Sequence, residues 1–221
     1  MSDAHGRIGH TLADAFEEDI LFGRMRPRER LIEDELMARS GSTRHAVRAA
    51  LVELEQRQLV VRVPNKGAQV RDFERAEIAQ ICDMRDWLHE RAARTMPLPA
   101  DVAWMDTLAA LQDLHDQAVA SAEPMAIHRA NAAFHAALFG GCGNRYLART
   151  INEFAQLSLA YRCHLMTRTD LARQAALEHH QMIDALRRSD ADQLAELCLQ
   201  HTKAARVVYE SLQGWRAPNG A

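Results

Sequence analysis

The sequence predicts a mainly α-helical protein, with an N-terminal winged helix-turn-helix followed by a C-terminal all-α helical bundle. Three observations lead to this fold class. Apolar residues recur at helical spacing along most of the chain. Short β-branched segments are confined to residues 59–71, where a Pro-Asn-Lys-Gly turn separates them. Basic residues are concentrated in residues 24–71, which hold ten arginines and one lysine against six acidic residues.

The first module, residues 1–72, is expected to contain three helices and a hairpin. An apolar stripe over residues 8–21 predicts the first helix, which ends before Pro27 because proline lacks an amide donor. A second helix begins near Ile32, and Thr43 can cap a third after a Ser-Gly-Ser turn. Two short strands then form the wing: residues 59–63 and 68–71.

The second module, residues 75–221, is expected to be an all-helical domain for effector binding and dimerisation. Its helix breaks fall at residues suited to helix ends: Pro97 and Pro99 follow the first helix, and Pro124 opens the third. The expected helices cover residues 75–96, 101–121, 124–139, 143–168, 170–188 and 190–214. Six helices of this length form a compact bundle.

Composition argues against several other classes of protein. The chain is 48% hydrophobic and 26% charged, which is unlike a long disordered segment. No apolar run reaches the roughly 18 residues of a membrane span, and the first ten residues lack the apolar segment of a secretory signal. The four cysteines form no CxxC pair. We therefore expect reduced thiols, a cytoplasmic location and no membrane association.

The basic module is expected to bind double-stranded DNA. Residues 24–71 carry a net charge of +5, whereas the segments before and after them each carry −4, so an anionic partner is expected for this module alone. A recognition helix enters the major groove with its N-terminal end. The candidate contacts on that helix and on the wing tip are Thr43, Arg44, His45, Arg48, Asn65, Lys66 and Gly67.

These candidates have different expected roles. Arg44 is the candidate base reader, because a guanidinium can donate two hydrogen bonds to one guanine. Thr43 is expected to bond a phosphate through its hydroxyl, and Arg48 a phosphate or a second base. The turn at the wing tip suits the minor groove or the backbone. The simpler alternative is a solvated basic face without a partner.

Histidines in the helical half have a spacing that suits a metal site. Asn131 and His135 are four residues apart and therefore share one helical face. His179 and His201 lie on consecutive helices that can run antiparallel and bring them together. Three imidazoles and one oxygen donor suit Zn²⁺ or Ni²⁺, and Mn²⁺ is a third candidate. Each histidine taken alone is more simply a surface or core residue, and His180 should point about 100° away from His179.

Three segments of the basic module, residues 23–36, 43–51 and 59–68, resemble the DNA-binding domain of GntR-family transcriptional regulators. The similarity covers about residues 8–72. It implies a winged helix that binds a palindromic operator as a homodimer, since two-fold protein symmetry matches two half-sites. Four positions depart from the family pattern and are expected to affect operator preference: Arg28, Ser42, Ala46 and Ala49.

The helical half resembles the FCD ligand-binding domain of the FadR-type subfamily, on Asn131, His135, His179 and His201. The resemblance implies that these four residues hold a divalent metal and that a small carboxylate effector completes its coordination. Asn131 stands where aspartate is common, which leaves the site one charge more positive.

The same resemblance places Arg85 where an arginine faces the effector, and Arg162 is a weaker candidate of this kind. A guanidinium suits a carboxylate because it can donate two parallel hydrogen bonds. The alternative for Arg85 is a helix-surface ion pair with Asp86 or Glu90.

The sequence therefore predicts a ligand-responsive, DNA-binding transcriptional regulator, expected to be a repressor rather than an enzyme. It would bind its operator as a homodimer and sense a small organic acid through a metal-containing helical domain. One alternative is the same regulator with a metal-free effector pocket. Another is a metalloenzyme fused to a DNA-binding module, although Glu178 before His179 lacks the spacing of an H-E-x-x-H general base.

Overall fold

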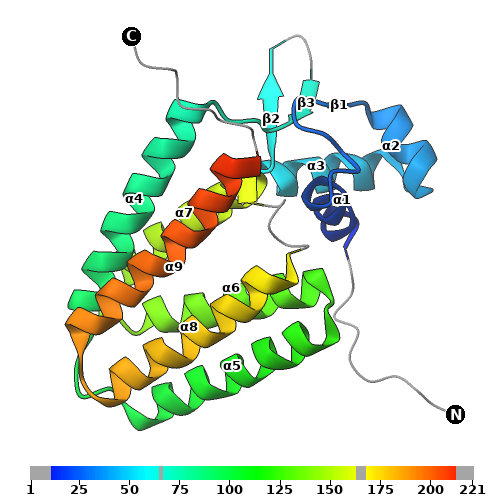
Figure 1. The fold of residues 1–221 in the computed structure, drawn as a ribbon. Helices are drawn as coiled ribbons and strands as arrows, with labels where there is room; N and C mark the ends of the chain where they lie inside the picture. Colours follow the sequence, from blue (N-terminus) through cyan, green and yellow to red (C-terminus); the bar gives the residue numbers. More distant parts are fainter. Residues whose placement is uncertain (1–10, 65–66, 163–167, 213–221) are drawn as a thin grey trace, which may run out of the picture. The chain divides into compact units, whose positions relative to one another are not determined.

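A computed structural model describes residues 11–64, 67–162 and 168–212. The chain divides into two compact units, residues 1–73 and 74–221 (Figure 1). The fold is mainly α-helical, with a winged helix-turn-helix in the first unit and a helical bundle in the second, which confirms the predicted fold class.

The first unit combines three helices with a small antiparallel sheet. Its elements are α1 (Leu12–Leu21), β1 (Arg30–Leu31), α2 (Glu33–Ser40), α3 (Arg44–Gln56), β2 (Val60–Val63) and β3 (Gly67–Val70). The strand order is β1-β3-β2, with Val60 opposite Val70 and Leu31 opposite Ala68. Strand β1 was not expected from the sequence, because two residues carry no alternation of apolar and polar side chains.

Local hydrogen bonds fix the three helices of the first unit. The Thr11 hydroxyl accepts from the Asp14 amide while the Asp14 carboxylate accepts from the Thr11 amide, which is a capping box at the start of α1. Arg57, which follows α3, donates to Asp14 and Glu17 and so fixes α1 against α3. Gly41 ends α2 at φ +65°, a left-handed conformation that turns the chain into α3.

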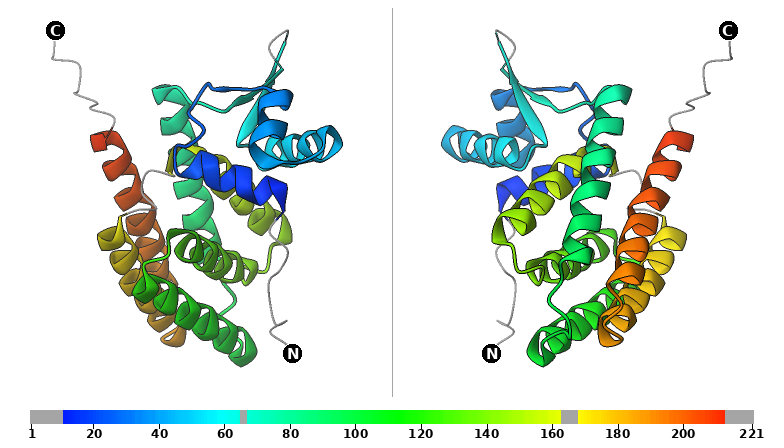
Figure 2. Two further views of the ribbon diagram at one scale, coloured as in Figure 1. Left: turned by 90° about the vertical axis from the view of Figure 1, so that its right-hand side faces the viewer. Right: turned by 90° about the vertical axis from the view of Figure 1, so that its left-hand side faces the viewer.

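The second unit is a bundle of six helices over the residues that the structure describes (Figure 2). They are α4 (Arg75–Arg94), α5 (Val102–Ser121), α6 (Pro124–Gly140), α7 (Arg145–Arg162), α8 (Thr169–Arg187) and α9 (Ala191–Leu212). Helix α5 packs against both α6 and α8, α4 packs against α7 and α9, and the α8–α9 contact joins these groups. The largest fully buried side chains of the shared core include Leu108, Phe134, Leu138, Met182, Leu186 and Leu194.

Several helix ends of the second unit differ by one or two residues from the expected positions. Helix α4 stops at Arg94, two residues early. Helix α7 begins at Arg145 rather than residue 143, because the Asn144 side chain accepts hydrogen bonds from the Tyr146 and Leu147 amides and so caps the helix.

Two further expectations concern thiols and membranes. Cys82, Cys142 and Cys198 are buried free thiols, whereas Cys163 lies outside the described residues. Across the described ranges, every helix is too short or too polar to cross a membrane.

Trp104 on α5 joins this helix to the end of α6. Its indole Nε1 donates a 2.9 Å hydrogen bond to the carbonyl of Ala137, one of the carbonyls near the C-terminus of α6 that lack helical partners. The ring lies against Gly141, where a Cβ atom would stand 2.1 Å from an indole carbon. This contact leaves no room for a side chain at position 141.

We expect Gly141→Ala to destabilise the second unit by about 1–3 kcal/mol, because the indole and the new methyl group cannot occupy the same space. The measurement is urea unfolding followed by tryptophan fluorescence, since all three tryptophans of the chain lie in residues 74–221. Gly140→Ala is the matched control: its Cβ would meet nothing within 4 Å, so stability should be unchanged or slightly raised. Equal losses in the two variants would contradict this account of Gly141.

Candidate metal centre and nucleic-acid interface

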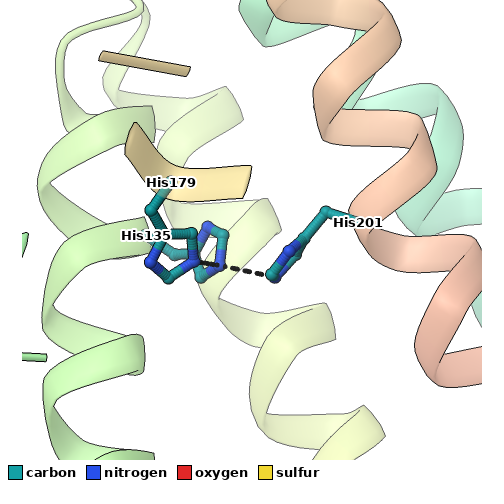
Figure 3. A group of neighbouring side chains, drawn as sticks. All are labelled: His135, His179 and His201. Carbon is teal, nitrogen blue, oxygen red and sulfur yellow. Dashed lines mark hydrogen bonds between the residues drawn. The ribbon is translucent and has the colours of Figure 1, made fainter. Parts of the chain in front are cut away.

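Three histidines from three helices converge in the second unit. His135 lies on α6, His179 on α8 and His201 on α9, and their rings face one another (Figure 3). The Nε2 atom of His135 is 3.0 Å from that of His201 and 3.2 Å from that of His179. One ring nitrogen from each residue lies within 4.8 Å of the others. The structure thus brings together the three histidines that the sequence singled out.

A buried glutamine determines which nitrogen of His179 faces this cluster. Gln112 on α5, 1% exposed, accepts a 2.8 Å hydrogen bond at its Oε1 from His179 Nδ1. Its Nε2 group donates to Asp116, an acceptor-only carboxylate, which fixes the orientation of the amide. His179 must therefore carry its proton on Nδ1, and its Nε2 lone pair points toward His135.

A carboxylate has the same effect on His201. Glu178 on α8 accepts a 2.6 Å hydrogen bond from His201 Nδ1, and its second oxygen accepts from Gln174. An ionised carboxylate can only accept, so His201 holds a proton on Nδ1, and in the neutral tautomer its Nε2 lone pair points toward His135. Metal-binding histidines commonly donate their outer N–H to such partners.

The resulting donor set fits a cation. His135 can place a proton on Nε2 and donate it to only one of its two neighbours, which leaves another nitrogen pair with facing lone pairs. Its Nδ1 is buried and has no hydrogen-bond partner among the described residues. Two imidazole nitrogens each about 2.1 Å from one ion lie roughly 3.0–3.4 Å apart at bond angles between about 90° and 110°. The separations of 3.0 and 3.2 Å between His135 and its two neighbours fall within that range, and the full set of three nitrogens lies within 4.8 Å.

The protonation states of the cluster also suit metal binding. Burial, reinforced by the neighbouring imidazoles, holds the pKa values of His135 and His179 well below their usual range. Burial raises the pKa of Glu178, but the hydrogen bonds from His201 and Gln174 outweigh it and lower the pKa overall. His135 and His179 are therefore neutral near pH 7, and neutral imidazole is the form that binds a metal.

Arg85 on α4 is buried near this cluster. Its side chain belongs to a residue only 6% exposed, and its Nε has no hydrogen-bond partner among the described residues. Its positive charge contributes to the lowered pKa of His135. The alternative of a helix-surface ion pair is therefore wrong. A buried guanidinium with an unpartnered donor near His135 is suited to a carboxylate ligand.

The other two residues expected at the cluster are less fully described. Asn131 lies one turn before His135 on α6 and is partly exposed. Arg162 is the last residue of α7, and its side chain lies outside the described residues. His180, by contrast, is more than half exposed and contacts Asp116 rather than the cluster.

Sequence reasoning gave no role at the cluster to three buried polar residues around the histidines. Gln112 and Glu178 orient two of the rings, and His115 packs on His179 with ring centroids 4.9 Å apart. His115 is fully buried, and neither ring nitrogen has a partner among the described residues. Gln112 and His115 are three residues apart within an otherwise apolar stripe of α5, which is the pattern that would have identified them.

The start of α3 is organised as the sequence predicts for a recognition helix. Thr43 is its N-cap, and the hydroxyl oxygen accepts from the Ala46 amide at 3.3 Å, which leaves the hydroxyl proton free to donate. Arg44, His45 and Arg48 are exposed on the first turns. Gly67 opens β3 at φ +78°, whereas Asn65 and Lys66 lie outside the described residues.

Both arginines of α3 are paired with acidic residues at the start of α2. Arg44 Nη2 donates to Asp34 at 2.5 Å, and Arg48 Nε donates to both oxygens of Glu33 at 2.9 and 3.0 Å. All four side chains remain at least 30% exposed, so DNA can reach them.

Comparisons with known proteins identify both units. Residues 9–70 match the sequence profile of the bacterial regulatory proteins of the gntR family, and residues 80–204 match that of the FCD domain. The HTH-type transcriptional repressor GlaR of Escherichia coli (strain K12) is 26% identical over 193 residues. The alignment covers 84% of this chain and 88% of that protein.

Solved structures share the fold. Escherichia coli McbR/YncC superposes with a TM-score of 0.74 at 17% identity, covering 91% of this chain and 96% of that one. A transcriptional regulator GntR from Rhodococcus sp. RHA1 gives a TM-score of 0.71 at 20% identity, with coverages of 93% and 97%.

The histidine pKa values generate a prediction for the metal-free protein. Because the pKa values of His135 and His179 are depressed in the folded state, the unfolded chain takes up more protons as the pH falls below about 6.5. Stability should therefore fall on acidification, by up to about 1.4 kcal/mol per pH unit for each histidine. Urea unfolding in chelator between pH 7.5 and 5.5, followed by tryptophan fluorescence, measures this slope. His179→Gln should lower it, and an unchanged slope would contradict the assigned protonation state.

Proposed function

The chain belongs to the GntR family of bacterial regulatory proteins, with an FCD domain after its winged helix, and we propose that it is a metal-dependent sensor of a small organic acid that represses transcription. In this proposal a homodimer binds a palindromic operator through its winged helices, because two-fold protein symmetry matches two half-sites. The similarity to GlaR, which is named a repressor, supports repression rather than activation. Because a regulator of chromosomal DNA acts in the cytoplasm, the proposed location of the protein is cytoplasmic.

The observation that carries the sensing function is the convergence of three histidine side chains, with the buried Arg85 close enough to His135 to affect its pKa. His135, His179 and His201 would hold the ion, and the amide oxygen of Asn131 is the proposed fourth donor. Zn²⁺ and Ni²⁺ suit three imidazoles, and Mn²⁺ is the third candidate. When bound, the metal would supply an electrophilic centre for one end of a carboxylate.

Arg85 is the proposed anchor of the carboxylate, and Arg162 is a second candidate for the same role. A guanidinium donates two hydrogen bonds to a carboxylate, so the metal and Arg85 together would select small organic acids over neutral molecules. Thermal shift of the metal-loaded protein with a series of small carboxylates measures this selectivity, and Arg85→Met should remove the response.

Effector binding would act by shifting the population between dimers that fit the operator and dimers that do not. Such a shift requires the effector to bind one of the two states more tightly. The other half of the proposal concerns the DNA surface, where Arg44 reads a base, Thr43 and Arg48 contact phosphate or a second base, and His45 lies beside them. The wing tip, Asn65, Lys66 and Gly67, would contact the minor groove or the backbone.

The alternative function that keeps the same DNA-binding module is a metal-free effector pocket. Buried His115 and Arg85 each have at least one nitrogen without a partner in the part of the chain that the structure describes, which favours polar ligands in either case. The family is one of transcriptional regulators rather than enzymes, which argues against the metalloenzyme alternative.

We expect purified wild-type protein, after incubation with Zn²⁺, Ni²⁺ or Mn²⁺ and desalting, to retain about one metal ion per chain. Elemental mass spectrometry measures the content. A His135→Ala, His179→Ala double variant should retain none, because it loses two of three imidazole ligands. His180→Ala, the neighbour that lies outside the cluster, is the control and should keep the metal. Wild-type protein without metal would favour the metal-free pocket.

We expect Arg44→Ala to lose specific operator binding while the protein stays folded, because a base-reading arginine contributes about 1–3 kcal/mol of discrimination. The probe is a duplex that the wild-type protein enriches from a pool of randomised sequences, and footprinting measures protection. Arg187→Ala, which removes the same charge from an exposed site on α8, is the control. An unchanged footprint with Arg44→Ala would refute the assignment.

A further inference from the structure

The recognition arginines carry a feature that DNA binding alone does not require: each is held by a carboxylate from the preceding helix. Arg48 Nε is 2.9 and 3.0 Å from the two oxygens of Glu33, and Arg44 Nη2 is 2.5 Å from Asp34. Acidic groups at a DNA-binding surface repel phosphate, so their position directly beside the two arginines calls for an explanation.

Each ion pair leaves part of the guanidinium available. Arg48 uses its Nε, so Nη1 and Nη2 make no hydrogen bond within the described residues. Arg44 uses Nη2, and its Nε and Nη1 are likewise without a partner there. A guanidinium has five N–H donors, and two adjacent ones are enough for the O6 and N7 atoms of guanine. Both arginines can therefore read a base edge without giving up their carboxylates.

A phosphate contact is affected differently. A phosphate on the same guanidinium lies near the carboxylate and is repelled by it, and the carboxylate has already neutralised the arginine charge that would release counterions. A guanine edge is uncharged and suffers no such repulsion. The carboxylates thus weaken contacts to the backbone, which are the same on every sequence, more than contacts to bases.

We propose that Glu33 and Asp34 are specificity-determining residues, which hold Arg48 and Arg44 toward base edges and suppress their binding to phosphates of non-operator DNA. The proposal rests on the assignment of these arginines as DNA contacts in the proposed function. Both pairs are exposed and therefore weak on their own. Their effect is expected in the ratio of operator to non-operator affinity rather than in the stability of the fold.

The ordinary explanation of these acids is helix stabilisation. Glu33, Asp34 and Glu35 all lie in the first turn of α2, where negative charge interacts favourably with the helix dipole. Glu35 separates the two explanations, because it is exposed in the same turn but makes no ion pair with residues that the structure describes. Glu35→Gln changes the net charge and the helix dipole as Glu33→Gln does, without releasing an arginine.

The test compares Glu33→Gln, Asp34→Asn and Glu35→Gln in the full-length protein. Affinity is measured by fluorescence anisotropy for the duplex enriched by wild-type protein and for the unselected random pool, across a salt series. Glu33→Gln and Asp34→Asn should each bind the random pool about 3–10-fold more tightly and the enriched duplex within about 2-fold of wild type. The salt slope on the random pool should steepen by about 0.9 for each arginine released onto a phosphate. Glu35→Gln should match wild type.

Three results would overturn the proposal. Equal tightening on both duplexes would mean that the acids only repel DNA in general. A Glu35→Gln effect as large as that of Glu33→Gln would assign the effect to overall charge. Unchanged binding by every variant would show that Glu33 and Asp34 have no role in DNA binding. Circular dichroism of each variant verifies folding. Arg44→Ala and Arg48→Ala in the same assay test the premise that these arginines contact DNA. If both variants keep operator binding, that assignment is wrong. The three results above would reject only the role of Glu33 and Asp34 in specificity.

Discussion

The helical unit depends on two adjacent residues of α8 that point to different helices. Successive residues on a helix are about 100° apart, so Glu178 reaches His201 on α9 while His179 reaches His135 on α6 and Gln112 on α5. These contacts link four helices through polar groups in a core that is otherwise apolar. Burying such groups is costly unless they are hydrogen-bonded, so their geometry constrains how the surrounding helices pack.

The two units share one kind of interaction: a carboxylate accepts a hydrogen bond from one nitrogen of a polar side chain and thereby determines which of its other nitrogens remain available. Glu178 behind His201 leaves a lone pair facing the cluster. Glu33 behind Arg48 leaves a pair of N–H donors facing outward from α3. In His201 the available group is the Nε2 lone pair, which suits a cation. In Arg48 the available groups are N–H donors, which suit a base edge.

Much of the fold was predictable because the chain marks its helix ends with proline, glycine and capping residues. Strand β1 was not, since Arg30 and Leu31 become a strand only by pairing with β3. The histidine cluster was predictable from spacing and family resemblance, but its partners were not. The polar Gln112 in an apolar stripe of α5 indicates a buried role, but it lies 67 residues from His179, and no local pattern shows that the two side chains meet. The pairing of Asp34 with Arg44 and of Glu33 with Arg48 was likewise not predictable, because the turn between α2 and α3 determines which side chains meet.

The Trp104 contact has a mechanical consequence for the helical unit. Its indole bond to Ala137 and its position over Gly141 prevent α5 and α6 from sliding past each other. Helix α5 carries Gln112 and α6 carries His135, so these two helices form one rigid frame on which two parts of the cluster are mounted. A rearrangement at the histidines would then move α8 and α9 against that frame. Helix α9 packs on α4, so a displacement of α9 would also act on α4, the partner within this unit that lies farthest from it along the chain.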